Sequence, residues 1–484
     1  MLPGLSHPTS DWQIIKQMKN NRFAFCASVF FILFADLAGQ TIKVSGQGDG
    51  YAGEKIEIYL LSDPISEKLN PVAIVKCDSE GKFMFELPAV SEYSAICLKS
   101  GVYLFKLLVC PGKEYQISLP PYVPVSQGDA ANPFFQPASL TPFVVNDTND
   151  INNITGEFDK TFSDVITRIT ERVANKTRLD DLPGLTESVN RLTGLSENRF
   201  YRDYVTFRMI MLNAVAYGEY PGRKEDSVMI NRRFSPENPA YTDLVNFLFR
   251  DYFRSLLSGP RAKQLSDAIK NGSLQACDDV ILQDGRIENR ELRHYVILLN
   301  MYYGFYNSLF DSGRLTGMLD AAVSEGATVY IRNLASVLKE YVFRMRKGSV
   351  PPQFSLPDTS GHIVSPSDLR GKYLLLVFAG DNGKETLSEL SLLKSWYDKY
   401  REKLSVAVIL TGGEFSKTVS FFTRRGYRWN FLDATGVPFL INQYEIRVLP
   451  GFILVDPEGR IAEDYCPLPS ENLEGFIVSL AGFR

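Results

Sequence analysis

The sequence predicts a multi-domain protein with an N-terminal antiparallel β-sandwich, a central all-α domain and a C-terminal α/β domain. Three patterns lead to this prediction. Apolar and polar residues alternate with a period of two over residues 41–120, apolar residues recur at helical spacing from about residue 151, and buried strands alternate with helices after residue 351. The length of 484 residues accommodates about three domains of ordinary size.

Residues 1–39 are expected to form an export signal. Lys16, Lys19 and Arg22 make a basic segment, and residues 23–35 are then almost wholly apolar. A helix over that apolar run would reach only ~20 Å, whereas a bilayer core is ~30 Å thick. We therefore expect a cleavable signal rather than a permanent membrane span, and a location in the periplasm or cell envelope.

The next region, residues 40–121, has the pattern of short strands separated by turns. Turn sequences occur at residues 78–82 and 110–112. Three sets of apolar residues each share one face of a strand: Ile56, Ile58, Leu60; Phe83, Phe85, Leu87; and Tyr115, Ile117, Leu119. Many short strands with regular turns favour a small antiparallel sandwich.

Residues 122–346 are assigned to a helical domain that follows a linker containing proline and asparagine. Its first helix carries an apolar stripe of Ile151, Ile154, Phe158, Phe162, Val165, Ile169 and Val173. Further helices are expected at residues 289–311 and 328–345. Stripes of this kind form a core more often than a cofactor site, and we expect a core here.

Residues 347–484 change to an α/β pattern. Strands are expected at 373–378, 406–410, 452–455 and 460–464, and helices at about 384–400, 414–425 and 470–480. Strands that alternate with helices imply a sheet with parallel pairs that is covered on both faces.

Residues 351–484 also carry motifs in a familiar order. These are Pro352-Gln353-Phe354-Ser355-Leu356-Pro357-Asp358, Leu369-Arg370-Gly371-Lys372, Tyr444-Glu445-Ile446-Arg447-Val448-Leu449-Pro450 and Phe452-Ile453-Leu454-Val455-Asp456. The segment resembles the thioredoxin-like domains of bacterial envelope thiol–disulfide oxidoreductases of the TlpA/ResA type. The whole layout is similar to exported Bacteroidota proteins that join an N-terminal β-domain of unknown function, a helical spacer and a thioredoxin-like domain.

The sequence departs from that family where its chemistry takes place. The resemblance implies a Cys-x-x-Cys segment at the start of the helix after the first buried strand, where the helix dipole stabilises the thiolate. Here the segment reads Gly383-Lys384-Glu385-Thr386, with Gly383 and Thr386 at the cysteine positions. The chain has no cysteine between Cys277 and Cys466. We therefore expect no dithiol chemistry, and expect Asp381 or Asn382 to cap the helix.

Leu449-Pro450 matches a second functional position of the family. The resemblance implies a cis-proline that faces the start of that helix, with the preceding residue pairing with an extended substrate peptide. One interpretation keeps this groove for peptide docking without redox chemistry, so the candidate binding residues are Gly383, Lys384, Glu385, Thr386, Leu449 and Pro450. In the other interpretation the proline only shapes the turn.

Other kinds of site have little support. The net charge of −4 and the lack of a clustered basic face argue against nucleic acid. His294 and His362 are the only histidines after the signal, and nothing in their spacing predicts a metal or a cofactor. A disulfide among Cys77, Cys97 and Cys110 is a minority alternative to three buried free thiols.

The predicted function is that of an exported envelope protein which binds an unidentified envelope protein or peptide and is not an enzyme. Two alternatives remain open at this point. The first is a thiol–disulfide oxidoreductase that uses a non-standard cysteine such as Cys466. The second is binding of a surface ligand such as a glycan through the N-terminal sandwich.

Overall fold

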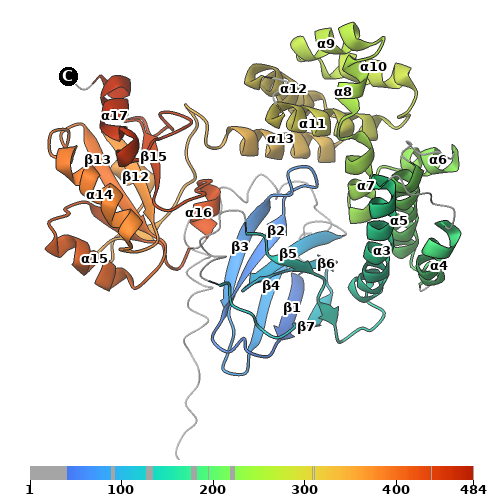
Figure 1. The fold of residues 1–484 in the computed structure, drawn as a ribbon, viewed down its shortest axis with the longest axis horizontal. Helices are drawn as coiled ribbons and strands as arrows, with labels where there is room; N and C mark the ends of the chain where they lie inside the picture. Colours follow the sequence, from blue (N-terminus) through green and yellow to red (C-terminus); the bar gives the residue numbers. More distant parts are fainter. Residues whose placement is uncertain are drawn as a thin grey trace, which may run out of the picture. The chain divides into compact units, whose positions relative to one another are not determined.

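The structure is a computed structural model that describes residues 41–88, 93–126, 135–175, 182–194, 196–217, 224–307, 309, 311–437 and 439–482. The expected signal at residues 1–39 lies outside these ranges. The chain divides into two compact units, and residues 338–484 make up nearly all of the second (Figure 1). Within the described ranges, no helix combines the length and apolarity needed to cross a membrane.

The first unit begins with two sheets. One has the order β4 (Lys82–Pro88), β1 (Thr41–Gln47), β7 (Glu114–Ser118), β9 (Phe143–Val144). The other has the order β3 (Leu69–Lys76), β2 (Lys55–Leu61), β5 (Ser94–Ser100), β6 (Tyr103–Val109), β8 (Ala138–Leu140). Alternate residues of β4 and β7 are buried, as the period of two predicts, and buried residues of both sheets contribute to one hydrophobic cluster.

The sheets are mixed, so the prediction of a wholly antiparallel region is wrong for two strand pairs. β1 runs parallel to β7, and β6 runs parallel to β8. The strands β8 and β9 come from residues that we had assigned to the linker and helical region. Apolar alternation tells which face of a strand is buried, but it does not tell which strand lies beside it.

Helices make up the rest of the first unit. They are α3 (Ile151–Ala174), α4 (Leu182–Leu192), α5 (Arg199–Tyr217), α6 (Lys224–Arg232), α7 (Pro239–Phe249), α8 (Tyr252–Leu257), α9 (Ala262–Lys270), α10 (Leu274–Asp284), α11 (Arg290–Tyr306), α12 (Ser312–Glu325) and α13 (Val329–Phe343), the last of which continues into the second unit. The side-chain amide of Asn152 on α3 bonds both main-chain groups of Leu108 on β6, at 2.7 and 2.9 Å. Asn246 on α7 donates to the carbonyl of Pro64 at 2.8 Å. These bonds join the helices to the sheets within one unit.

The second unit contains a four-stranded sheet with the order β14 (Asn430–Asp433), β13 (Leu404–Leu410), β12 (Tyr373–Ala379), β15 (Gly451–Val455). The first three strands are parallel, and β15 is antiparallel to β12. The other elements are β10 (Leu356–Pro357), β11 (Ile363–Val364), η2 (Pro366–Leu369), α14 (Lys384–Tyr397), α15 (Phe415–Arg424), α16 (Phe439–Gln443), η3 (Pro469–Glu471) and α17 (Leu473–Ala481).

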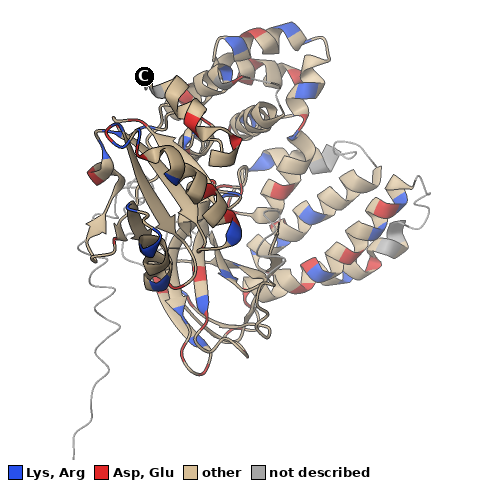
Figure 2. Cartoon of the chain, turned by 60° about the vertical axis from the view of Figure 1, so that its left-hand side comes forward, with Lys and Arg blue, Asp and Glu red and all other residues tan. Residues whose placement is uncertain are grey.

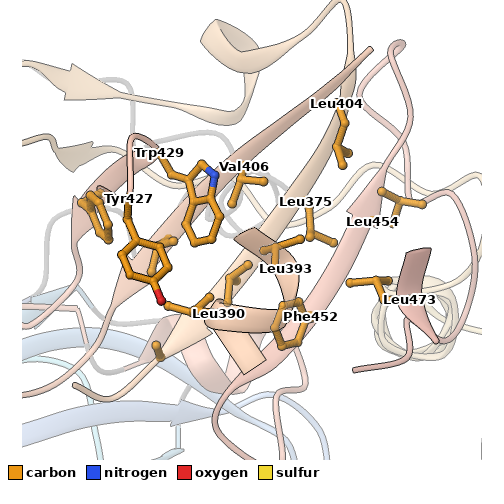
Figure 3. Packing of buried hydrophobic residues seen from close by; sticks show 14 of the residues in the cluster. Leu375, Leu390, Leu393, Leu404, Val406, Tyr427, Trp429, Phe452, Leu454 and Leu473 are labelled. Carbon is orange, nitrogen blue, oxygen red and sulfur yellow. The ribbon is translucent and has the colours of Figure 1, made fainter. Parts of the chain in front are cut away.

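Both faces of this sheet are covered, which confirms the prediction from the buried strands. Leu375, Val377 and Ala379 of β12 belong to one hydrophobic cluster, and the alternate residues Leu374, Leu376 and Phe378 belong to the other. Figure 3 shows Leu390 and Leu393 packed near Leu375 and Phe452 in the first cluster.

Three short elements differ from the prediction. Residues 460–464 form no strand, because the pairing is limited to a single bridge between Val455 and Ile461. The strand β14 and the helix α16 were not predicted. The four residues of β14 and the five of α16 show no clear period in the sequence.

Candidate functional site

The turn from β12 to α14 forms one side of the candidate site. β12 ends at Ala379, and α14 begins at Lys384 with Gly383 as its N-cap residue. The expectation that Asp381 or Asn382 would cap the helix is wrong, because the helix has no side-chain cap. The Asp381 carboxylate instead accepts a hydrogen bond from the Gly383 N–H at 2.8 Å, which closes the turn ahead of the helix.

Gly383 and Thr386 lie together at this helix start. Gly383 has an ordinary backbone conformation with φ −60°. A Cβ added there would lie 3.0 Å from the Asp381 carboxylate, the mobile end of an exposed side chain, so a larger residue fits after a small shift. Thr386 is buried in the first turn, whereas Lys384 and Glu385 are exposed.

The loop that precedes β15 forms the opposite side. The Leu449–Pro450 bond is cis, in agreement with the resemblance. Gly451, the next residue, pairs with Phe378 near the end of β12. A Cβ built on Gly380 would lie 3.6 Å from Cδ1 of Leu449. The fold therefore brings the two segments named by the sequence analysis to the same edge of the sheet.

The main chain beside Pro450 has unpaired hydrogen-bonding groups within the described ranges. The main chain of Leu449 makes no hydrogen bond to another residue in the described ranges. Val448, just before it, is an apolar side chain with 64% of its surface exposed. An extended segment could pair with main-chain groups of this kind and place an apolar side chain on Val448.

A third segment, the β13–α15 loop, completes the edge. The Thr411 N–H donates to the Ala379 carbonyl at 2.9 Å, which holds this loop against the end of β12. Next to it lies an open hollow of about 450 Å³, which we call the α15 hollow. It is lined by Asn382, Ser416, Lys417, Thr418, Ser420, Phe421 and Arg424.

The sequence analysis did not identify the residues of the α15 hollow. Ser416, Ser420 and Arg424 recur at four-residue spacing on one helix face. That signal was present in the sequence, but every exposed helix face has the same spacing. Figure 2 shows basic and acidic residues interspersed over the helices of both units.

The cysteines are all unpaired among the described residues, so the minority alternative of a disulfide is not realised. Cys466, the thiol proposed for non-standard chemistry, packs against the hydrophobic cluster that contains Leu375. Burial raises the pKa of the Cys466 thiol to about 12. Burial therefore disfavours the thiolate at neutral pH, and the thiolate is the form that attacks a disulfide. The described residues also contain no group of three or more His, Cys, Asp and Glu side chains that could hold a metal ion.

Part of the chain is similar in sequence to known proteins. No family model matches the chain. The thiol-disulfide oxidoreductase ResA of Bacillus thuringiensis is 27% identical over 144 residues, which cover 28% of this chain and 78% of that protein. The ResA of Bacillus subtilis is 27% identical over 147 residues, covering 28% of this chain and 74% of that protein. The C-terminal unit is a thioredoxin-like domain of the TlpA/ResA type.

Solved structures match a similar share of the chain. A putative thiol-disulfide oxidoreductase from Bacteroides vulgatus is 17% identical, with a TM-score of 0.26, and the match covers 28% of this chain and 97% of that chain. A thiol-disulfide oxidoreductase from Bacteroides fragilis is 28% identical, with a TM-score of 0.24, and the match covers 27% of this chain and 99% of that chain.

Proposed function

We propose that this is an exported cell-envelope protein whose ResA-type domain binds an extended polypeptide segment beside Leu449–Pro450 and does not catalyse dithiol–disulfide exchange. The segment belongs to another envelope protein or peptide. The basic and apolar residues within 1–39 support export, because they have the order of a cleavable signal.

One observation carries the non-redox part of the proposal. The chain has no sulfur at Gly383 or Thr386, nor at any other residue between Cys277 and Cys466. Exchange begins with a thiolate that attacks a disulfide, and the second thiol then releases the product. An alcohol such as Thr386 does not ionise near neutral pH and forms no disulfide.

Binding is supported by the groups that remain at the same edge. The Leu449 main chain is unpaired within the described ranges, and Val448 is exposed. Addition of one strand to such a backbone supplies affinity through main-chain hydrogen bonds, and the neighbouring side chains then select the sequence.

An insulin-reduction assay with dithiothreitol tests the first part. The purified full chain should not exceed the uncatalysed rate. As a matched positive control, Gly383→Cys combined with Thr386→Cys should form a disulfide and accelerate the reaction, because the two positions are three residues apart on one helix start. Turnover by the wild-type chain that disappears in Cys466→Ser would overturn this part.

A pair of surface variants tests the binding part. Val448→Asp places a charge where the peptide would dock and should abolish binding of capped octapeptides on an array. Ile363→Asp is the control, because Ile363 lies on β11 and is exposed to 63%, compared with 64% for Val448. If no peptide binds the wild-type chain, or if both variants weaken binding equally, the binding proposal fails.

A further inference from the structure

The α15 hollow lies on the same edge as the proposed docking site. Asn382 reaches it from the β12–α14 turn, and the other lining residues come from α15. With a volume of about 450 Å³, it has room for a side chain of a bound peptide.

Close approaches at three glycines connect the hollow to Leu449. A Cβ on Gly380 would touch Leu449, and a Cβ on Gly412 would lie 3.0 Å from the Gly380 carbonyl oxygen. One on Gly413 would lie 3.3 Å from Cβ of Asp381 and 3.6 Å from the Thr418 hydroxyl. Leu449, the turn at Gly380, the turn at Gly412 and Gly413, and Thr418 therefore lie in this order in space. An extended peptide at Leu449 can place a side chain in the hollow.

The charged groups of the hollow are basic. The Arg424 guanidinium uses one of its five N–H donors, Nε, on the Ser420 carbonyl of its own helix at 3.1 Å. Its remaining donors have no acceptor within the described ranges. Lys417 contacts Glu414 at 2.7 Å on an exposed part of α15, where such a pair contributes little. Neither contact prevents these cations from meeting an anion.

Thr418 supplies a second, independent observation. Its side chain lines the hollow and is only 4% exposed. Its hydroxyl has no hydrogen-bond partner among the described residues. The hydroxyl is therefore available to donate to an acceptor atom of a ligand in the hollow.

We infer that the peptide bound beside Leu449 carries an acidic side chain, and that its carboxylate enters the α15 hollow to contact Arg424, Lys417 and Thr418. This inference rests on the proposed binding function and specifies the chemistry of the partner. A carboxylate fits because it accepts from both a guanidinium and a hydroxyl.

The experiment uses fluorescein-labelled, capped octapeptides of alternating Val and Ala. A single Glu is moved through the positions, and a Gln peptide is made for each. Binding to the full chain is measured by fluorescence anisotropy. At one or two adjacent positions, Glu should bind about three- to fivefold more tightly than Gln, as expected for one partly exposed ion pair.

Matched variants test whether the preference for Glu over Gln arises in the α15 hollow. Arg424→Gln should reduce the Glu-to-Gln ratio to near one without changing the affinity for the Gln peptide, and Thr418→Val should lower it in part. Arg428→Gln removes the same charge from an exposed residue outside the hollow and should leave the ratio unchanged.

The outcomes separate the two proposals. Equal binding of Glu and Gln peptides, with both weakened by Val448→Asp, overturns the acidic partner and leaves the docking site in place. Equal effects of Arg424→Gln and Arg428→Gln also overturn it, because the attraction would then be a property of the net charge. No binding by any peptide overturns both proposals.

Discussion

The helical region around Asp278 and the α15 hollow use the same types of polar side chain in opposite ways. On α10 and α11, Arg293 and Asp278 are buried and form two hydrogen bonds, at 2.6 and 3.1 Å. On α15, Arg424 is exposed, and its one hydrogen bond within the described ranges is to the carbonyl of Ser420. Polar groups satisfied by the protein hold its helices in place, whereas groups left open can contact a ligand. Substitutions of the same residue type in the two regions should therefore differ in their effect on stability.

The largest difference is expected between the two arginines. Arg293→Leu leaves Asp278 buried without its two hydrogen bonds to Arg293 and should lower the free energy of unfolding by about 3–5 kcal/mol. Arg424→Gln should change it by less than about 0.5 kcal/mol. Urea unfolding combined with amide hydrogen exchange on α10, α11 and α15 measures both. Similar losses in the two variants would contradict the distinction between the regions.

The second-largest difference in stability is expected between two asparagines, Asn300 and Asn382. Asn300 donates to the carbonyls of Phe249 and Val296 and accepts from the Phe253 N–H, all at 2.8 Å. Asn300→Ala leaves buried main-chain groups without partners and should lower the free energy of unfolding by about 1–3 kcal/mol. Asn382→Ala, in the α15 hollow, is the control and should have almost no effect in the same urea experiment. An equal effect of Asn382→Ala would mean that the hollow is part of the stabilising framework.

His294 should give the protein a pH-dependent stability. Its Nδ1 accepts from the Ala327 N–H at 3.1 Å, so the folded state requires a neutral ring. Burial accordingly lowers the pKa of His294 from its ordinary value of 6.5. The unfolded chain then binds more protons, and stability falls as the pH drops through about 6.5 toward the lower folded pKa, by at most about 1.4 kcal/mol per pH unit.

Urea unfolding of wild-type and His294→Gln chains between pH 7.5 and 5.5 measures this effect. The variant should lose the His294 part of the slope. His362→Gln should keep the slope, because the His362 side chain is exposed. A slope that is unchanged in His294→Gln would contradict the assignment.

The smallest difference in stability is expected between two threonines, Thr418 and Thr155. Thr418→Val removes a hydroxyl that has no partner among the described residues, so the free energy of unfolding should change by less than about 0.5 kcal/mol. Thr155→Val, on α3, removes a buried hydroxyl that donates to the Ile151 carbonyl at 2.7 Å and should cost about 1 kcal/mol. Urea unfolding compares the two. A larger loss at Thr418 would mean that its hydroxyl already has a stabilising role.

Much of the C-terminal domain could be predicted because its signals are local. The apolar runs of β12 and β13 and the helices between them follow from periods within short windows. Gly383 and Thr386, and likewise Leu449–Pro450, were found by aligning the sequence with the family that it resembles. The N-cap was predicted wrongly, because Asp381, Asn382 and Gly383 all suit a helix start and only the path of the turn distinguishes them.

The sequence by itself determined the ResA-type elements, the absence of thiols at the start of α14 and the cis Leu449–Pro450 position, because each depends on residues close together in the chain. Only the tertiary structure decided the parallel pairing of β1 with β7, the burial of Asp278 with Arg293, and the α15 hollow. These features join residues far apart in the chain, and no local pattern records which distant partner will satisfy a polar group or leave it open.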